Sequence, residues 1–200
     1  MKLPQLNRVP NRVPTMSFKR SLTEPLIIVY DLETTGLSAD TDRIIQISAR
    51  KCERQEDGQY KETDSRMWYI KPSIPLPERI TDLTGITEEM LSDKQTEEEI
   101  INEVAEYFES YAVAGYNNDS FDNMFMRNLY GRNGKEFRPK QSYDVLTYAK
   151  IRIPRSCIGR YKLSTVATYL GVCEDATFHN AEGDTQVTLG VLNRLIREDN

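Results

Sequence analysis

The chain has 200 residues and a mass of 23.1 kDa, enough for one compact domain and too little for two ordinary ones. Its composition, 38% hydrophobic and 28% charged, is typical of a soluble globular protein, and no apolar run approaches the roughly 18–20 residues that span a bilayer. Residues 1–24 are rich in proline, arginine and asparagine where a secretory signal would be apolar, so membrane insertion and secretion are both disfavoured.

The three cysteines, Cys52, Cys157 and Cys173, are widely spaced and form no CxxC motif. This usage disfavours a disulfide framework or a thiolate zinc site, and it fits a reducing compartment. We therefore expect a cytoplasmic protein with no membrane partner.

The net charge of −5 conceals a strong charge asymmetry along the chain. Residues 1–24 carry a net charge of +4, residues 87–109 hold nine acids against one lysine, and residues 127–162 hold ten basic side chains against two acids. The overall acidity disfavours binding to polyanions, whereas the last of these segments suits a local phosphate contact. On charge alone, two solvated faces of opposite sign explain the pattern equally well.

The first 24 residues predict a flexible tail before a single domain over residues 25–200. The tetrapeptide Asn-Arg-Val-Pro occurs twice in tandem, at 7–10 and 11–14. Frequent prolines remove amide donors and restrict φ, so neither a helix nor a central strand is expected there.

Three strands are expected first in the domain. The unbroken apolar run Leu26–Tyr30 is typical of a strand covered on both faces. Residues 43–51 alternate between apolar residues and polar ones such as Gln46 and Ser48, which predicts a second strand. A turn signal at Asp57 and Gly58 leads to a third strand over residues 66–71, and prolines at 72, 75 and 77 then favour an extended connection.

Helices and short strands alternate through the rest of the chain. Thr96 and Glu99 form a capping-box signal before apolar residues at helical spacing. The elements expected next are a strand at 112–115, a helix ending at Gly131, a short strand at 143–146 running into 147–150, and helices at 161–170 and 183–196. This order predicts an α/β fold with a mixed central β-sheet flanked by α-helices.

Two carboxylates follow the most strongly predicted strand. Asp31 and Glu33 stand at positions i and i+2, so they emerge on one face of an extended chain, about 7 Å apart. Two such charges repel each other unless a cation lies between them, and carboxylate oxygens suit Mg²⁺ or Mn²⁺. The pair alone is weak evidence, because acids are frequent enough here for several Asp-x-Glu pairs to arise by chance.

Three further titratable residues lie at helix starts or in the loops before them. Asp122 falls in the first turn of the helix after the strand at 112–115, a position that helix capping also favours. Asp184 opens the last helix on its apolar face, so its carboxylate points toward the core and requires a partner. His179, the one histidine, precedes it in a loop, where a base with a pKa of about 6.5 is useful in catalysis.

Together these residues resemble the motifs of the DnaQ-like, DEDDh 3′–5′ exonucleases. Three segments carry the resemblance: Asp31-Leu32-Glu33-Thr34-Thr35-Gly36-Leu37, Asn118-x-x-Phe121-Asp122 and His179-Asn180-Ala181-Glu182-Gly183-Asp184. They occur in order with suitable chain lengths between them, and the similarity covers about residues 25–197. Supporting similarities lie at residues 83–87, 143–146 and 162–171.

The resemblance implies an RNase H-like fold and phosphodiester hydrolysis with two divalent cations, Mg²⁺ or Mn²⁺. It implies that Asp31, Glu33 and Asp184 hold the first ion, that Asp31 also reaches the second, and that Asp122 helps to position the second. His179 is implied to take the proton from the attacking water. Residues implied to contact the 3′-terminal nucleotide are Thr34, Thr35, Gly36, Leu37, Ile86, Asn118 and Phe121.

The family resemblance leaves more than one substrate and partner open. Similarity to polymerase-associated exonucleases favours DNA over RNA and a polymerase as partner. An RNA-trimming exoribonuclease or oligoribonuclease, and a polymerase-associated binding scaffold with the tail as its docking peptide, are the alternatives. One position departs from the pattern: many family members have histidine where this chain has Asn117, which affects a secondary contact and not the metal site.

Overall fold

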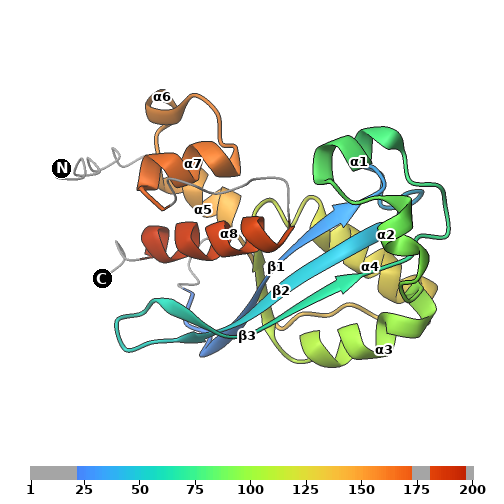
Figure 1. Ribbon diagram of the computed structural model, residues 1–200. Helices are drawn as coiled ribbons and strands as arrows, with labels where there is room; N and C mark the ends of the chain where they lie inside the picture. Colours follow the sequence, from blue (N-terminus) through green and yellow to red (C-terminus); the bar gives the residue numbers. More distant parts are fainter. Residues whose placement is uncertain (1–21, 173–180, 197–200) are drawn as a thin grey trace.

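The computed structural model describes residues 22–172 and 181–196, which form a five-stranded sheet with helices on both faces (Figure 1). The strands are β1 (Leu26–Thr34), β2 (Ile44–Arg54), β3 (Tyr60–Tyr69), β4 (Ala112–Gly115) and β5 (Ser142–Asp144). Their order across the sheet is β3-β2-β1-β4-β5. β1 pairs antiparallel with β2 and parallel with β4, so the sheet is mixed, as the sequence predicts.

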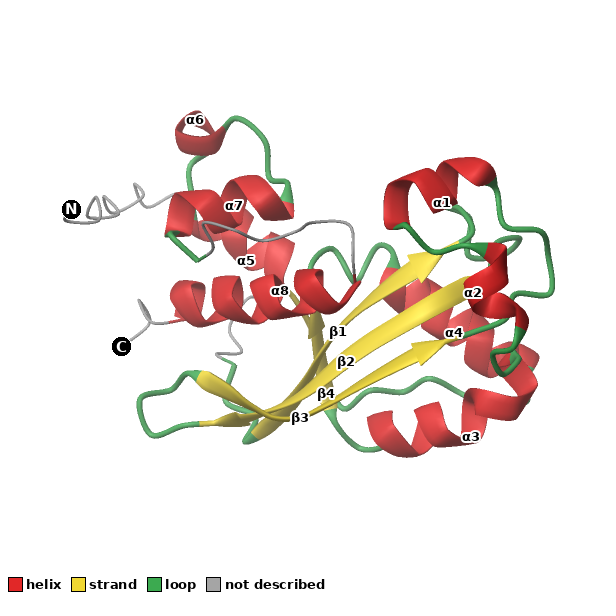
Figure 2. Cartoon of the chain, in the orientation of Figure 1, coloured by secondary structure: helices red, strands yellow, loops and turns green. Residues whose placement is uncertain are grey.

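Two groups of helices cover the two faces of this sheet (Figure 2). The helices are α1 (Glu78–Thr84), α2 (Glu88–Ser92), α3 (Glu97–Phe108), α4 (Asp122–Arg132), α5 (Val145–Arg152), α6 (Arg155–Ile158), α7 (Leu163–Leu170) and α8 (Ala181–Ile196). α3 and α4 pack on one face through a core that includes Phe108 and Phe125. α5, α7 and α8 pack on the other face through a core that includes Val145, Val166 and Val191. The predicted α/β fold is confirmed.

Strand β1 supplies side chains to both cores. Tyr30 and Leu32 belong to the core under α3 and α4, whereas Val29 belongs to the core under α5, α7 and α8. Because successive side chains of a strand point to opposite faces, Asp31 and Glu33 lie on the same face as Val29, beneath α8. The alternation of this one strand therefore places the acid pair on a defined side of the sheet.

Three strands are longer than the sequence predicts. β2 continues to Arg54, because its last three residues remain paired with β3. β1 continues to Thr34, because the residues after its apolar run remain paired with β2. β3 begins at Tyr60 rather than Arg66, since its mostly polar first half is held by backbone hydrogen bonds to β2, and only Tyr60 of that half is buried. Composition alone does not reveal a strand that is stabilised in this way.

Three short helices, α1, α2 and α6, were not among the expected elements. Each has one or two turns, too few to display a helical period in the sequence. α1 starts directly after Pro77 and ends at Gly85, whose φ of 74° glycine adopts without strain. The extended connection predicted from the prolines therefore ends at Pro77. The predicted capping box is present at the start of α3, and Gly171 ends α7 as expected.

The first described residues already pack against the domain. Leu22 is buried with the core under α5, α7 and α8. The Glu24 carboxylate pairs with Lys140 at 2.7 Å, and its carbonyl accepts a hydrogen bond from the Tyr60 hydroxyl at 2.6 Å. Residues 1–21 of the expected tail lie outside the described residues. None of the described helices is long and apolar enough to cross a bilayer.

Candidate active site

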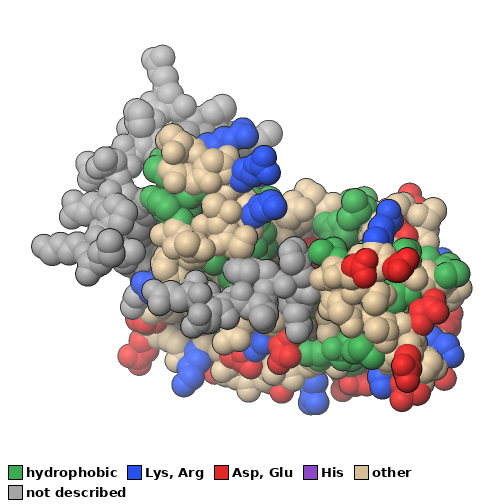
Figure 3. All heavy atoms as spheres, turned by 45° about the horizontal axis from the view of Figure 1, so that its top comes forward, with side chains coloured by type: hydrophobic (Ala, Val, Ile, Leu, Met, Phe, Trp, Pro, Cys, Tyr) green, Lys and Arg blue, Asp and Glu red, His purple; other side chains and the backbone are tan. Residues whose placement is uncertain are grey.

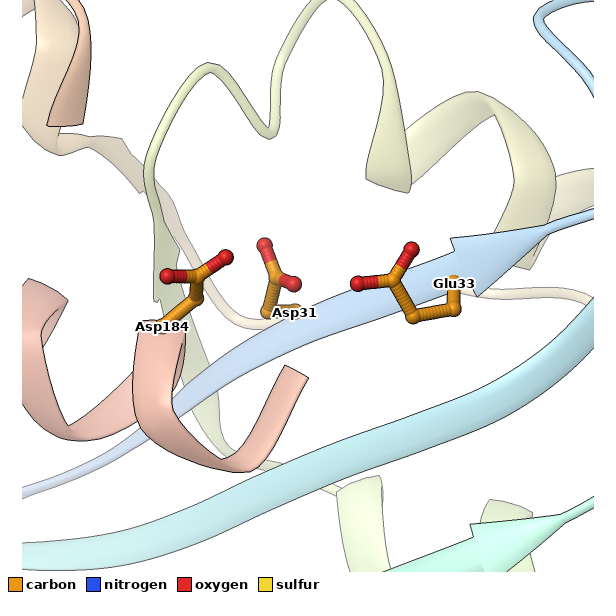
Figure 4. A group of neighbouring side chains, drawn as sticks. All are labelled: Asp31, Glu33 and Asp184. Atoms are coloured by element: carbon orange, nitrogen blue, oxygen red, sulfur yellow. The ribbon is translucent and has the colours of Figure 1, made fainter. Parts of the chain in front are cut away.

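Three carboxylates from two elements converge over the centre of the sheet (Figure 4). Asp31 and Glu33 project from β1, and Asp184 projects toward them from the first turn of α8. One carboxylate oxygen from each residue lies within 4.8 Å of the other two, and all three side chains are half-buried. The structure thus brings together three of the predicted site residues from positions about 150 residues apart in the sequence.

A buried arginine holds the start of α8 against the sheet. Arg50 of β2 is 7% exposed; its Nε donates to Thr185 Oγ1 at 2.9 Å, and its Nη2 donates to the Glu182 carbonyl at 3.0 Å. Its Nη1 forms an ion pair with Glu62 of β3 at 2.5 Å. Glu182 and Thr185 flank Asp184 in the chain, so Arg50 fixes the backbone from which the Asp184 carboxylate projects.

Asp122 lies beside this group without being one of the three. It occupies the first turn of α4 and is 4% exposed. Its carboxylate accepts a hydrogen bond from the backbone N–H of Leu32, the residue between Asp31 and Glu33. Leu32 lies beyond Val29, the last residue of β1 that pairs with β4. The structure therefore places the fourth predicted acid against the segment of β1 that carries the acid pair.

Side-chain hydrogen bonds fix the loop that leads into α4. The Tyr30 hydroxyl donates to Asn123 Oδ1 at 2.7 Å, and Asn123 Nδ2 donates to Ser142 Oγ at 2.9 Å. Asn118 is fully buried and donates to the same hydroxyl at 3.1 Å. A Cβ at Gly115 would lie 2.7 Å from that of Asn118, so only glycine fits there. The buried Asn118 side chain therefore holds the loop against β5.

Burial and mutual repulsion raise the pKa values of the site carboxylates. Burial raises the pKa of Asp31 well above its usual range, with further increases from Asp122, Asp184 and Glu33. Burial, and then Asp184, raise the pKa of Glu33 to about 7. Burial also raises the pKa of Asp122 to about 7, although backbone hydrogen bonds oppose the increase. Four ionised carboxylates so close together repel one another, so binding of protons or of a cation stabilises the group.

We expect the metal-free protein to lose stability as pH rises from about 5 to about 8. Glu33 and Asp122 bind protons more tightly in the folded than in the unfolded chain. Their stabilising contribution is therefore complete below the unfolded pKa values and is lost as pH passes through about 7. A divalent cation binds the ionised carboxylates, so it should raise the melting temperature more at the higher pH.

The increase in melting temperature on adding Mn²⁺, relative to chelator, is measured by thermal unfolding at about pH 5 and at about pH 8. A Glu136→Gln variant, which removes an exposed acid outside the carboxylate group, should keep the same metal effect. An equal increase in melting temperature at both pH values would contradict the expectation.

The segment after the acid pair forms a tight turn. The Thr34 hydroxyl donates to the Gly36 carbonyl at 2.6 Å, and the fully buried Thr35 hydroxyl bonds to the Asp42 carboxylate at 3.2 Å. A Cβ at Gly36 would lie 2.4 Å from that same carboxylate. These three residues therefore stabilise the turn itself. Leu37, in contrast, is 86% exposed.

The other two predicted apolar contacts differ in their exposure. Ile86 is 3% exposed and packs with Ile80 and Leu91, so it presents little surface. Phe121 is half-buried, with its ring centroid 4.9 Å from that of Phe125.

One predicted residue cannot be placed, and one important residue was missed. His179 lies outside the described residues. Arg50 was not singled out, because a charged residue in an alternating strand resembles a solvated position. Its one available signal was its position on the same strand face as Gln46 and Ser48, a polar face that the fold buries.

Comparisons with known proteins agree with this geometry. The RNase_T family model, described as exonuclease, matches residues 28–192. The chain is 35% identical over 162 residues to the PolC-type DNA polymerase III of Pediococcus pentosaceus, covering 80% of this chain and 11% of that protein. It is 32% identical over 185 residues to that of Thermotoga petrophila, covering 92% and 13%. The chain thus spans about a tenth of the length of the curated relatives it matches.

Solved structures share the fold. A zinc-bound complex of Escherichia coli exonuclease I with single-stranded DNA has a TM-score of 0.73 at 20% identity, covering 88% of this chain and 41% of that one. Exonuclease I from Methylocaldum szegediense has a TM-score of 0.70 at 24% identity, covering 86% and 40%. The mixed sheet is therefore that of the RNase H-like exonuclease fold. With the family model spanning this fold and the three acids gathered over its centre, the chain belongs to the DnaQ-like exonuclease family.

Proposed function

We propose that the chain is a metal-dependent 3′–5′ exonuclease that removes nucleotides from the 3′ end of single-stranded or frayed DNA. The observation that carries the proposal is the group formed by Asp31, Glu33 and Asp184, with Asp122 against the same segment of β1. No structural role requires four buried or half-buried acids at one point of the sheet. Their repulsion is a cost to the metal-free fold.

The donor set suits divalent cations. The three oxygens within 4.8 Å of one another need only small adjustments to share one ion, and hard oxygen ligands favour Mg²⁺ or Mn²⁺. Asp31, Glu33 and Asp184 would hold the first ion; Asp31 and Asp122 would serve the second. Two such ions, when bound, lower the pKa of a water and stabilise charge on the attacking and leaving oxygens of a phosphodiester.

Residues of the chain would bind and orient the 3′ end of the DNA. The exposed Leu37 side chain lies three residues after Thr34 at the end of β1, where it can pack against a terminal base. The turn that presents it is fixed by the Thr34 and Thr35 hydrogen bonds. His179 would accept the proton of the attacking water as a general base.

Two comparisons support DNA as the substrate. The curated relatives compared above are PolC-type DNA polymerases, and a structural neighbour was solved with single-stranded DNA. They also support a polymerase as the partner of this chain. The metal chemistry itself acts on phosphate, so RNA is the substrate class against which DNA must be compared.

The proposed function is tested with a 5′-labelled single-stranded DNA and an RNA of the same sequence, incubated with Mg²⁺, Mn²⁺ or chelator. We expect a ladder that shortens from the 3′ end, faster on DNA, and absent with chelator. A faster RNA ladder would assign the chain to RNA trimming. Folded protein that gives no ladder on either substrate would support the binding-scaffold alternative.

Replacing His179 with alanine is expected to lower turnover by about 10²–10⁴-fold, because the attacking water loses its proton acceptor. Metal-induced stabilisation should persist, since the carboxylates are untouched. Steady-state turnover and thermal unfolding with Mn²⁺ check the two parts. An unchanged turnover would remove His179 from the mechanism.

A further inference from the structure

We propose that the surface of α5, α6 and α7, residues 145–170, binds the single strand upstream of the nucleotide held at the carboxylate group. We call this surface the α5–α7 face. This inference rests on the proposed function and specifies its substrate as a single strand several nucleotides long.

The α5–α7 face carries one sign of charge. It contains five basic side chains, Lys150, Arg152, Arg155, Arg160 and Lys162, and no acid. At the chain's average of 31 acids in 200 residues, a segment of this length would hold about four. In a chain of net charge −5, this local excess creates the positive potential that a phosphate backbone requires.

Three of the other basic residues in the 127–162 segment are held in ion pairs. Arg132 pairs with Glu97, Arg138 with Glu136, and Lys140 with Glu24. Acids already neutralise those three charges.

Most of the charges on the α5–α7 face have no such neutralisation. Within the described chain, no carboxylate lies within salt-bridge distance of Lys150, Arg155, Arg160 or Lys162, and all four are exposed. Lys and Arg side chains gather along the helices at the upper part of Figure 3. These four charges are therefore available to an incoming polyanion.

A hollow of about 500 Å³ between α6 and α7 adds contacts for bases. It is lined by the hydroxyl residues Ser164, Thr165 and Thr168, and by Tyr169. Proteins that bind single strands combine a positive groove with aromatic side chains on which unpaired bases stack. Duplex DNA keeps its bases stacked inside, so this combination favours a single strand.

The α5–α7 face adjoins the carboxylate group. α7 and α8 pack side by side, and both begin on the side nearer the middle of the molecule (Figure 1). Lys162 is the N-cap residue of α7, and Asp184 lies in the first turn of α8. A strand with its terminal phosphate at Asp184 can therefore continue past Lys162 onto the face.

The test removes three of the charges together. The variant Arg155→Gln/Arg160→Gln/Lys162→Gln is compared with Lys135→Gln/Arg138→Gln/Lys140→Gln, which makes the same change in net charge on the surface beside α3. Both are made in an Asp31→Asn background, and binding of a fluorescent oligothymidylate is measured in chelator, so that no strand is cut. We expect the first variant to bind about tenfold or more weakly, and its salt dependence to fall by about 2 in log–log slope for three phosphate contacts.

The control variant should bind within about twofold of its parent, since Arg138 and Lys140 are already paired and Lys135 lies with them beside α3, away from the α5–α7 face. Equal losses in the two variants, or none in either, would overturn the proposal. A blunt duplex that binds as tightly as the single strand, and loses as much in the first variant, would overturn the single-strand assignment.

A small substrate separates this inference from the proposed function. The p-nitrophenyl ester of thymidine 5′-monophosphate occupies only the carboxylate group, so both triple variants with Asp31 intact should hydrolyse it at the unmodified rate. If the unmodified chain does not hydrolyse it, the proposed function fails while the binding comparison still tests the face. If the first variant alone loses ester hydrolysis, the three residues act at the carboxylate group, and the proposal is overturned.

Discussion

An Asp31→Asn variant is expected to lose nucleolytic turnover by about 10³-fold or more, because it removes several kcal/mol of charge stabilisation at the reacting phosphate. The same variant should melt at a higher temperature than the unmodified chain in chelator at about pH 8. The pKa of Asp31 is raised well above its usual range by burial and by three neighbouring carboxyl groups. Its stabilising contribution is lost as pH rises, and asparagine has no proton to lose.

Lower turnover together with a higher melting temperature would distinguish a metal-binding residue from one that only supports the fold. A residue that merely supports the fold loses both together. An Asp93→Asn variant, which removes an acid from the exposed end of α2, serves as the matched control and should change neither. An Asp31→Asn variant that retains more than about a tenth of the turnover would contradict the assignment of Asp31 as a metal ligand.

The second large effect is expected at Arg50. Replacing it with methionine keeps much of the side-chain volume but removes the hydrogen bonds to Thr185, the Glu182 carbonyl and Glu62. Buried hydrogen bonds to a charged group are lost, so we expect the free energy of unfolding to fall by about 3 kcal/mol. Because the start of α8 is then less well fixed, the metal concentration for half-maximal activity should rise by about 10–100-fold.

Two further variants separate positioning from general stability. Arg50→Lys retains a charged donor on β2 and should recover part of the metal affinity. Glu62→Gln removes the ion pair but leaves the hydrogen bonds of Arg50 to α8, so it should lower stability without changing the metal requirement. Metal titrations of turnover, analysed separately for half-saturation and maximal rate, provide the measurement. An unchanged metal requirement in Arg50→Met would show that Arg50 only stabilises the fold.

The sequence predicted the site best where a single element determined the geometry. The i, i+2 spacing of Asp31 and Glu33 on β1 was sufficient to place both on one face. The helical period of α8 predicted that Asp184 would face the core, and its Val187 and Val191 are buried as expected. In each case local periodicity and tertiary burial agree.

The sequence predicted least where distant segments meet. Arg50 reaches partners 12 and 135 residues away, and no local pattern encodes either contact. Gln46 and Ser48 resemble solvent-facing positions, but they are 2% and 3% exposed, and the Ser48 hydroxyl bonds to that of Thr185 on α8. The first half of β3 depends on pairing with β2, and α1 and α2 are too short to show a period. Such features follow from the assembled sheet and not from any single segment.

The central claim is that Asp31, Glu33 and Asp184 together bind a divalent cation. Anomalous diffraction from crystals grown with Mn²⁺ and a nucleoside 5′-monophosphate tests it most directly. We predict an anomalous peak between the three carboxylates, within ordinary oxygen–metal bonding distance of each, and its loss in the Asp31→Asn variant. A folded site with nucleotide bound and no peak among these carboxylates would contradict the account.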